Sequence, residues 1–474
     1  MILNYITNFI FFVFLIFSLF QLAKFNLYLL YLWQFKEYRP DRLKIYFINK
    51  SDRAEFFSFF NIMNFIALKH PRLTLRLFFS FLIILLIDYQ LLFFSFRPAA
   101  RILNFTDSFG INLLLIILVI YLISPLLVSL VIILSSLLTF PFKRLIILLA
   151  ILKIRKFKNL LVIGVTGSYG KSTTKEALFQ TLSLKYSVLK TPKNINTEIG
   201  IAKLILTKLN KNHQIFVVEI GAYKKGEIKA VCNIVNPKIG ILTGINEQHL
   251  GIFKNLKNTI EAKSELIKSL PSDGLALFNA ANPYTYKLFT KRTKCEKALY
   301  GLRSKKYLEA LDLCWVIAKK MGIRHAQFDK IIPQLNRLLD IKIYRGYKNV
   351  KILDDSYNSN PSGFFKAVGS LDKVNKKRLV ITPGIIELGS KSKQIHSALG
   401  ASLAKIADVI IVTNNNFYDD FKTEVDQKDK EKFWLVTDKV KTKNWLIQNI
   451  SRNWVILLEG RVPYWVGQNL KKIK

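Results

Sequence analysis

The sequence predicts a helical membrane region followed by two α/β domains, and three observations lead to this fold class. Residues 1–140 contain long apolar runs with almost no charge, which is typical of transmembrane helices. From Leu160 onward, short apolar runs alternate with helical patterns, which indicates α/β domains with largely parallel sheets. A glycine-rich loop lies between the first of these runs and the first helical pattern, which is typical of a phosphate-binding domain.

Three apolar stretches are long enough to cross a bilayer. Residues 2–23 carry no charge, and they lack the basic start and small-residue cleavage site of a signal peptide. Residues 78–96 contain Asp88, which is costly in lipid and needs a partner or a buried place in the bundle. Residues 111–140 are expected to tilt or to kink at Pro125, with two short re-entrant pieces as the alternative.

The basic residues predict the orientation of these helices. The segment between the first two spans is rich in Lys and Arg, whereas the next loop holds Arg97 and Arg101 alone. Because cytoplasmic loops carry an excess of basic residues, we expect a multi-pass protein of the cytoplasmic (inner) membrane. The catalytic part, which follows residue 140, would then lie in the cytoplasm.

Contact with membrane lipid is predicted for two segments. The segment Trp33–Arg39 is interpreted as an interfacial anchor, with a lipid-headgroup site as the alternative. Residues 145–158 mix apolar and basic residues and predict an interfacial helix. The net charge of +39 comes from 71 Lys and Arg against 32 Asp and Glu, spread through the chain rather than in one stripe. This distribution favours a membrane surface and argues against a nucleic-acid partner.

The loop Gly164–Thr174 carries the clearest chemical signal. Its glycines let backbone N–H groups point at an anion, and the following helix adds positive potential. Lys171 would reach the terminal phosphates and Ser172 would hold Mg²⁺. A chance glycine turn is the weaker alternative, because Gly-Lys-Ser between a strand and a helix seldom arises that way.

The spacing of this loop is shorter than that of the common phosphate loop, because Val165 stands where the first glycine is expected. The short form resembles the loop of the Mur ligases and folylpolyglutamate synthetases, which are ATP-dependent amide-bond formers. The resemblance implies that ATP binds the loop residues Thr166, Gly167, Ser168, Tyr169, Gly170, Lys171, Ser172 and Thr173.

Downstream residues extend the resemblance to metal ligands. Glu219 ends a buried apolar strand beside the loop, where a carboxylate is well placed to bind Mg²⁺. His249 follows the end of the next strand, where Mur ligases carry a metal-binding histidine; a structural histidine is the alternative. Lys263 matches a family lysine that is carbamylated and can hold a second Mg²⁺, although alone it would be a solvated surface residue. The resemblance thus implies metal binding by Ser172, Glu219, His249 and Lys263, and catalytic roles for Lys171, Lys263 and His249.

Substrate and nucleotide contacts are implied by four further matches. Asn194 and Asn196 lie in a segment similar to one near the family's substrate and phosphates. Asn279 matches an adenine-side asparagine, although the acidic residue that follows it in the family is missing, and Arg337 matches an arginine that reaches ATP. The segment 353–361 resembles the Asp-x-Tyr-Asn-x-Asn-Pro segment of the MurF branch. It implies an ATP contact for Asp355 and substrate contacts for Tyr357, Asn358 and Asn360.

The matched motifs follow the family order as far as His396. They imply a central ATP-binding Mur ligase domain over residues 156–335 and a Rossmann-like C-terminal domain over residues 336–474, after a membrane region over residues 1–155. The implied enzyme uses ATP and Mg²⁺ to convert a carboxylate into an acyl phosphate. It then adds an amino acid, or a dipeptide such as D-Ala-D-Ala, to a cell-wall precursor.

Three departures from the MurF pattern concern substrate recognition. The membrane region replaces the domain that grips the substrate's uridine nucleotide, and residues 300–307 are too few for a usual His-Asn segment. Residues 459–461, Glu-Gly-Arg, stand where the family commonly has a lysine-glycine turn. We therefore expect a membrane-associated acceptor or docking of the enzyme at the membrane. The alternatives are a Mur-type ligase for a non-cell-wall carboxylate, and a membrane P-loop ATPase or scaffold without ligase activity.

Overall fold

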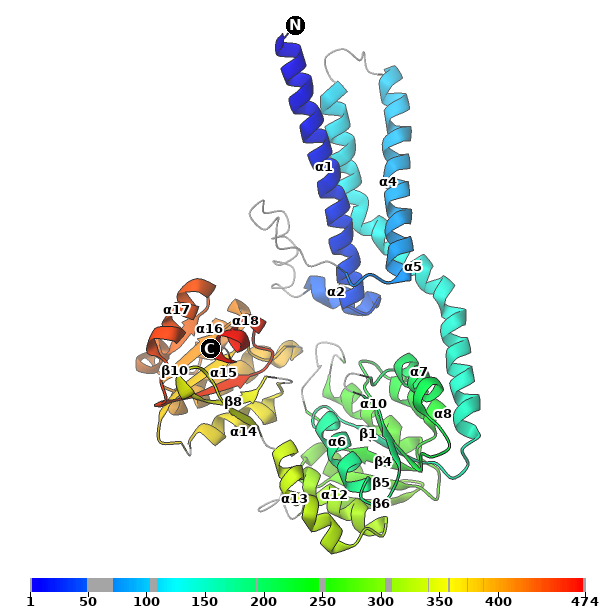
Figure 1. Cartoon of the computed structure of the whole chain (residues 1–474), viewed down its shortest axis with the longest axis vertical. Helices are drawn as coiled ribbons and strands as arrows, with labels where there is room; N and C mark the ends of the chain where they lie inside the picture. The colour runs from blue at the N-terminus through cyan, green and yellow to red at the C-terminus, as the bar shows by residue number, and fades with distance from the viewer. Residues whose placement is uncertain are drawn as a thin grey trace. The chain divides into compact units, whose positions relative to one another are not determined.

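The computed structural model divides into two compact units, Met1–Leu145 and Ile146–Lys474, each of which is described by itself (Figure 1). The residues that it describes are 2–48, 71–102, 109–192, 195–246, 253, 255–302, 309–339, 341–356, 359–372, 374–386 and 388–471.

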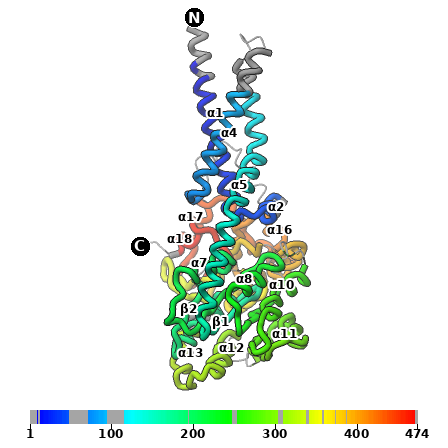
Figure 2. Tube along the Cα trace, turned by 90° about the vertical axis from the view of Figure 1, so that its right-hand side faces the viewer, coloured from blue at the N-terminus to red at the C-terminus, as the bar shows by residue number. Residues whose placement is uncertain are grey.

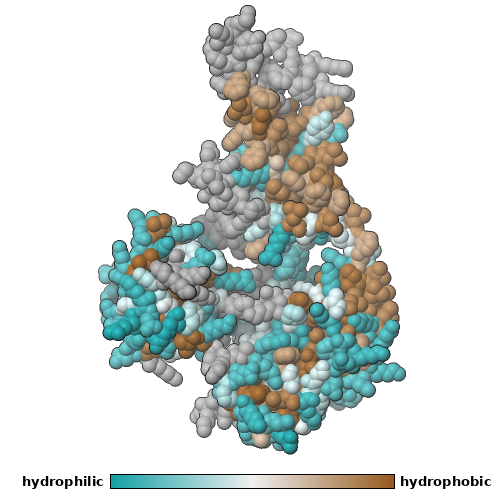
Figure 3. Space-filling view, in the orientation of Figure 1, coloured by the Kyte–Doolittle hydropathy of each residue, from teal (hydrophilic) through white to brown (hydrophobic). Residues whose placement is uncertain are grey.

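The first unit consists of long apolar helices that run side by side (Figure 2). Three stretches are long and apolar enough to cross a membrane, at Phe12–Phe35, Leu75–Phe94 and Leu115–Arg155, in line with the number predicted. Their surface is largely apolar (Figure 3). Membrane insertion and orientation stay predictions. The helices are α1 (Ile2–Phe35), α2 (Pro40–Ile48), α4 (Leu75–Ile102) and α5 (Phe109–Arg155).

Two side chains of the helix bundle test what the sequence predicts for Asp88 and Trp33. The Nδ2 group of Asn26 donates to Asp88 Oδ2 at 2.7 Å, and both residues are buried, so Asp88 has the partner that its apolar surroundings require. The interpretation of Trp33 as an interfacial anchor is wrong, because its ring is buried in the bundle core and its Nε1 donates to Ser129 Oγ at 3.2 Å. The re-entrant alternative is wrong as well, because α5 is one continuous helix.

The last part of α5, from Ile146, belongs to the second unit. Ala150 and Ile154 are buried in a core that they share with the middle domain. Leucines elsewhere on this segment, among them Leu148 and Leu152, are exposed. The predicted interfacial helix therefore uses one face for protein packing, and membrane contact by the other face stays a prediction.

The middle domain is built on a six-stranded, fully parallel sheet in the order β2-β3-β1-β4-β5-β6. Helices α6, α12 and α13 cover one face, and α7, α8, α10 and the end of α5 cover the other (Figure 1). The strands are β1 (Leu161–Thr166), β2 (Val188–Lys190), β3 (Ile215–Glu219), β4 (Ile239–Leu242), β5 (Leu275–Asn279) and β6 (Glu296–Tyr300). The helices are α6 (Lys171–Leu182), α7 (Glu198–Lys208), α8 (Glu227–Val235), α10 (Leu256–Lys268), α11 (Pro283–Phe289), α12 (Glu309–Lys320) and α13 (His325–Leu339).

The C-terminal domain has a second six-stranded sheet in the order β11-β10-β9-β12-β8-β7, parallel except for β7. Helices α14, α15 and α16 pack on one face and α17 and α18 on the other. The sheet begins after α13 ends, so the boundary predicted at residue 336 lies inside a helix. The strands are β7 (Lys342–Arg345), β8 (Lys351–Asp355), β9 (Lys377–Thr382), β10 (Val409–Val412), β11 (Phe433–Leu435) and β12 (Trp454–Glu459). The helices are α14 (Pro361–Asp372), α15 (Ser392–Ile406), α16 (Tyr418–Lys422), α17 (Lys439–Asn449) and α18 (Tyr464–Lys471).

Candidate functional site

The loop between β1 and α6 forms a cradle at the carboxyl end of the middle sheet. Gly170 has a φ of 75° and stands directly before α6, where a left-handed conformation favours glycine. A Cβ on Gly167 would lie 2.1 Å from the Thr243 hydroxyl and 2.9 Å from the Gly244 carbonyl, so this backbone must also be glycine. Because the first turn of a helix leaves N–H groups without helical partners, the start of α6 directly after this loop is suited to bind an anion.

Lys171 lies inside this cradle. Its Nζ donates to the carbonyl oxygens of Gly167 at 2.8 Å and Ser168 at 3.2 Å. Burial lowers the pKa of Lys171, and the Glu219 carboxylate partly offsets that effect. The ammonium group is thus held where a phosphate bound by the loop would meet it.

Ser172 and Glu219, which are both predicted to hold Mg²⁺, lie in contact. The Ser172 hydroxyl donates to Glu219 Oε1 at 2.9 Å, which joins the start of α6 to the end of β3. Hydroxyl and carboxylate oxygens are the ligands that Mg²⁺ prefers, so this pair fits the predicted metal. Thr173 lies in the same first turn of α6.

Lys175 is a residue of this cluster that the motif analysis missed. Its Nζ lies 3.0 Å from Glu219 Oε2, and both side chains are almost completely buried. The pair leaves Glu219 with one oxygen toward Ser172 and the other toward a fixed cation. Lys175 follows Lys171 by about one helical turn and therefore lies on the same face of α6. This spacing was the signal in the sequence that could have identified Lys175.

The segment around Asn196 packs beside the end of β3. Thr191 accepts a hydrogen bond from the Glu219 N–H at 3.0 Å, and the Asn196 carbonyl accepts one from Gly221 at 3.0 Å. On the other side, the Thr166 hydroxyl donates to the Ile220 carbonyl at 2.8 Å. These contacts fix the place of Glu219; Asn194 lies outside the described residues.

Lys263 is buried rather than solvated. It is 2% exposed on α10, and its Nζ donates to the Ala222 carbonyl at 3.5 Å. Burial, together with the Lys171 ammonium, lowers the pKa of Lys263 to about 7, although Glu227 and Glu265 oppose the shift. A substantial neutral fraction at neutral pH is what reaction of the amine with CO₂ requires, so the residue fits the predicted carbamate.

The predicted metal ligand His249 lies outside the described residues, so it stays a prediction. In the described part of the chain, no group of three or more His, Cys, Asp or Glu side chains is arranged to hold a metal ion. Asn246, just before His249, is buried and its N–H donates to Ser168 Oγ at 3.3 Å. Its Nδ2 donates to Asn360 Oδ1 at 3.1 Å, which joins the phosphate loop to a predicted substrate residue. Motif matching did not single out Asn246.

On the predicted adenine side, Asn279 has its amide already engaged. Its Nδ2 donates to the Thr243 carbonyl at 2.7 Å and to the carboxylate of Glu309, and its Oδ1 accepts from the Ala281 N–H. Glu309, at the start of α12, thus supplies an acidic group beside Asn279, where the sequence comparison found the usual acidic neighbour missing. The contact of Glu309 with Asn279 cannot be read from the sequence, because the two residues are 30 positions apart.

For the C-terminal domain, only some of the predicted site residues lie in the part of the chain that the structure describes. Arg337 lies in the last turn of α13, and its side chain is outside the described residues, as are Tyr357 and Asn358. Asp355 ends β8, and Asn360 stands directly before α14. His396, the last residue of the matched motifs, is fully buried and its Nε2 accepts from the Ile385 N–H at 3.0 Å. Burial lowers its pKa to about 4, so it is a neutral residue that holds the loop after β9.

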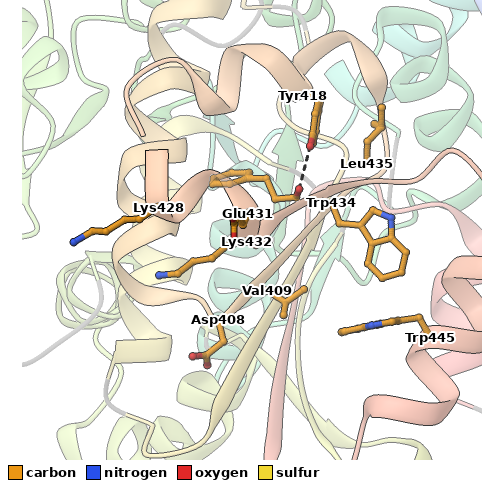
Figure 4. Close-up of a pocket in the computed structure, with 10 residues that line it drawn as sticks. Asp408, Val409, Tyr418, Lys428, Glu431, Lys432, Trp434, Leu435 and Trp445 are labelled. Atoms are coloured by element: carbon orange, nitrogen blue, oxygen red, sulfur yellow. Dashed lines mark hydrogen bonds between the residues drawn. The ribbon is translucent and has the colours of Figure 1, made fainter. Parts of the chain in front are cut away.

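A separate pocket of about 500 Å³ lies beside β11 in the C-terminal domain (Figure 4). Trp434 and Trp445 form one side, and Lys428, Lys432 and Asp408 form another. None of the predicted site residues lines it. We therefore treat this pocket as separate from the site.

Comparison with protein families identifies both α/β domains. The Mur ligase middle domain matches residues 165–329, and the "Mur ligase, glutamate ligase domain" matches residues 341–462.

Curated relatives and solved structures agree with these domains. The UDP-N-acetylmuramoyl-tripeptide–D-alanyl-D-alanine ligases of Bacillus subtilis and Escherichia coli are 27% and 25% identical to this chain, over 51% and 52% of it. The chain covers 60% and 63% of those relatives, so it spans about three fifths of their length. The crystal structure of MurF from Acinetobacter baumannii covers 69% of this chain with a TM-score of 0.60 and 24% identity, and 79% of that structure is matched. MurF from Thermotoga maritima in complex with ADP covers 67% with a TM-score of 0.53 and 24% identity, and 80% of it is matched. At these identities the two structures support the fold.

Proposed function

Because this chain belongs to the Mur ligase family, whose middle and C-terminal domains match residues 165–329 and 341–462, we propose that it is an ATP-dependent amide ligase of the MurF type. The observation that carries the proposal is the contact of Ser172 with Glu219 behind the Lys171 loop. A phosphate cradle, a cation and an oxygen pair for Mg²⁺ are the parts that phosphoryl transfer needs.

In the proposed first step, a substrate carboxylate attacks the γ-phosphate of ATP and forms an acyl phosphate and ADP. The loop N–H groups and Lys171 would hold the phosphates as negative charge shifts toward ADP. Ser172 and Glu219 would hold Mg²⁺, which neutralises phosphate charge when it is bound. Lys175 would hold the Glu219 carboxylate in place through their ion pair.

In the proposed second step, an amine displaces phosphate from the acyl phosphate and forms the amide. Carbamylated Lys263 and His249 would hold a second Mg²⁺, and the proposed ATP contacts of Asn279, Arg337 and Asp355 would orient the nucleotide. The described hydrogen bond between Asn246 and Asn360 supports a role for the C-terminal domain in closing the site and excluding water.

The relatives named above are ligases of D-alanyl-D-alanine and UDP-N-acetylmuramoyl-tripeptide. We propose the same donor class, an amino acid or a dipeptide such as D-Ala-D-Ala, and a cell-wall acceptor that is membrane-associated. The apolar helices of the first unit support membrane docking, since they hold three stretches long enough to span. Membrane lipid would then be a further partner of this region.

The test of this proposal is an ADP-release assay on the full-length protein in vesicles, with UDP-linked and lipid-linked precursors as acceptors and a panel of amines. We expect ADP release to require both an acceptor and an amine. Release that ignores both would favour the ATPase alternative, and no turnover under any condition would favour a scaffold. Turnover with a carboxylate outside the cell wall would favour the second ligase alternative.

Two truncations separate membrane docking from folding. Removal of residues 1–145 is expected to leave the α/β domains folded, because the second compact unit begins at Ile146. Removal of residues 1–155 also deletes Ala150 and Ile154 and is expected to destabilise the middle domain by several kcal/mol, roughly the burial free energy of two or more apolar side chains. Thermal unfolding measures both effects. Equal melting temperatures for the two truncations would contradict this account of α5. Full activity of the protein that lacks residues 1–145 on a soluble UDP-linked acceptor would contradict membrane docking.

A further inference from the structure

Two carboxyl groups face each other at the carboxyl edge of the C-terminal sheet, where the proposed function uses Asp355 alone. Asp355 ends β8 and Glu459 ends β12, and the two residues are register partners on adjacent parallel strands. Glu459 is fully buried. The resemblance places a lysine-glycine turn of the family here, whereas the glutamate of this chain gives a like-charged pair with Asp355.

One oxygen of Glu459 has no hydrogen-bond partner among the described residues. Ser359 Oγ donates to Glu459 Oε1 at 2.8 Å, whereas Oε2 is buried and without a donor. Burial raises the pKa of Glu459 well above its ordinary value, and the Asp355 carboxylate raises it further. Burial also raises the pKa of Asp355, while Glu459 and Lys366 lower it and Asp354 adds to the rise. Burial and mutual repulsion therefore disfavour two negative charges at this edge of the sheet unless a positive charge lies beside them.

We propose that Asp355, Ser359 and Glu459 form a subsite for an ammonium group, namely the amino end of the donor in the ligation. An ammonium group brings the positive charge that the pair lacks and the N–H donors that Glu459 Oε2 requires. Asp355 and Ser359 are only partly buried, so the pair is open on their side. The loop after β12 closes the other side, since the Gly460 N–H donates to the Asp355 carbonyl at 3.2 Å. Only the identification of this ammonium group as the donor of the ligation rests on the proposed function.

The experiment compares binding of D-alanyl-D-alanine and N-acetyl-D-alanyl-D-alanine to the full-length protein in nanodiscs by calorimetry. The acetylated dipeptide keeps the shape of the probe and lacks the ammonium group. We expect the unchanged protein to bind the free dipeptide about tenfold or more tightly than the acetylated one. Glu459→Gln should remove most of that preference.

Glu459→Lys is the matched variant, because lysine would form an ion pair with Asp355. We expect this variant to lose the preference and to unfold at the same or a higher temperature, which a merely structural role of Glu459 would not produce. Equal binding of both dipeptides, or of neither, by the unchanged protein would overturn the proposal. So would a Glu459→Gln variant that weakens ATP binding and leaves dipeptide binding unchanged. If the protein prefers the free dipeptide but never forms an amide, the proposed function fails and the ammonium subsite stands.

Discussion

Replacing Lys171 by alanine is expected to lower the rate of ATP-dependent amide formation by roughly 10³-fold, the loss typical of one preorganised charge removed from a reacting group. The Lys171 ammonium lies on the loop carbonyls of Gly167 and Ser168, inside the cradle. Lys175 cannot replace it, because that ammonium is paired with Glu219. The measurement is the turnover of the full-length protein at saturating ATP.

Lys203→Ala is the matched control, because Lys203 is an exposed lysine of α7 in the same domain. It should leave turnover unchanged. Lys171→Ala should unfold at nearly the same temperature as the unchanged protein, since its hydrogen bonds are confined to one loop. Turnover of Lys171→Ala close to that of the control would contradict the role of the loop.

Replacing Lys263 by methionine is expected to lower turnover by roughly 10²-fold or more, because a ligand of a catalytic metal ion is worth several kcal/mol. Methionine keeps most of the side-chain volume in a buried site, so the fold should survive. Lys268→Ala, an exposed position on the same helix, is the control. Full turnover of Lys263→Met would contradict a catalytic role for carbamylated Lys263.

The carbamate also predicts a dependence on pH and bicarbonate. Only the neutral amine reacts with CO₂, and burial holds the pKa of Lys263 near 7. Lysine is therefore increasingly protonated below pH 7, and we expect turnover of bicarbonate-depleted protein to fall there and to recover on adding bicarbonate at pH 8. Mass spectrometry of the intact protein at pH 8 should show the added CO₂. Turnover that is insensitive to bicarbonate at both pH values would contradict this prediction.

The sequence was sufficient for the parts of the fold and site that depend on short segments. The short apolar runs after Leu160 predict the largely parallel sheets of both α/β domains, because buried parallel strands are continuous apolar stretches. The contact of Ser172 with Glu219 was predictable as well, since Glu219 ends the strand beside β1 and Ser172 begins the helix that follows β1.

Contacts between distant segments were not predictable in the same way. Trp33 carries the composition of an interfacial anchor, and only the packing of α1 against α5 reveals its buried place. The contact of Glu309 with Asn279 depends on how α12 returns to the sheet. Lys263 has the sequence signature of an exposed helix position, and its burial depends on the strands and loops packed around α10.

The most direct test of the proposed chemistry is the fate of carboxylate oxygen. The acceptor carboxylate is labelled with ¹⁸O, and the inorganic phosphate released during ligation of D-alanyl-D-alanine is analysed by mass spectrometry. A ligase that passes through an acyl phosphate transfers one labelled oxygen to each phosphate, in step with amide formation. ADP and phosphate that form without the label would contradict the account, because ATP would then be hydrolysed without activating the carboxylate.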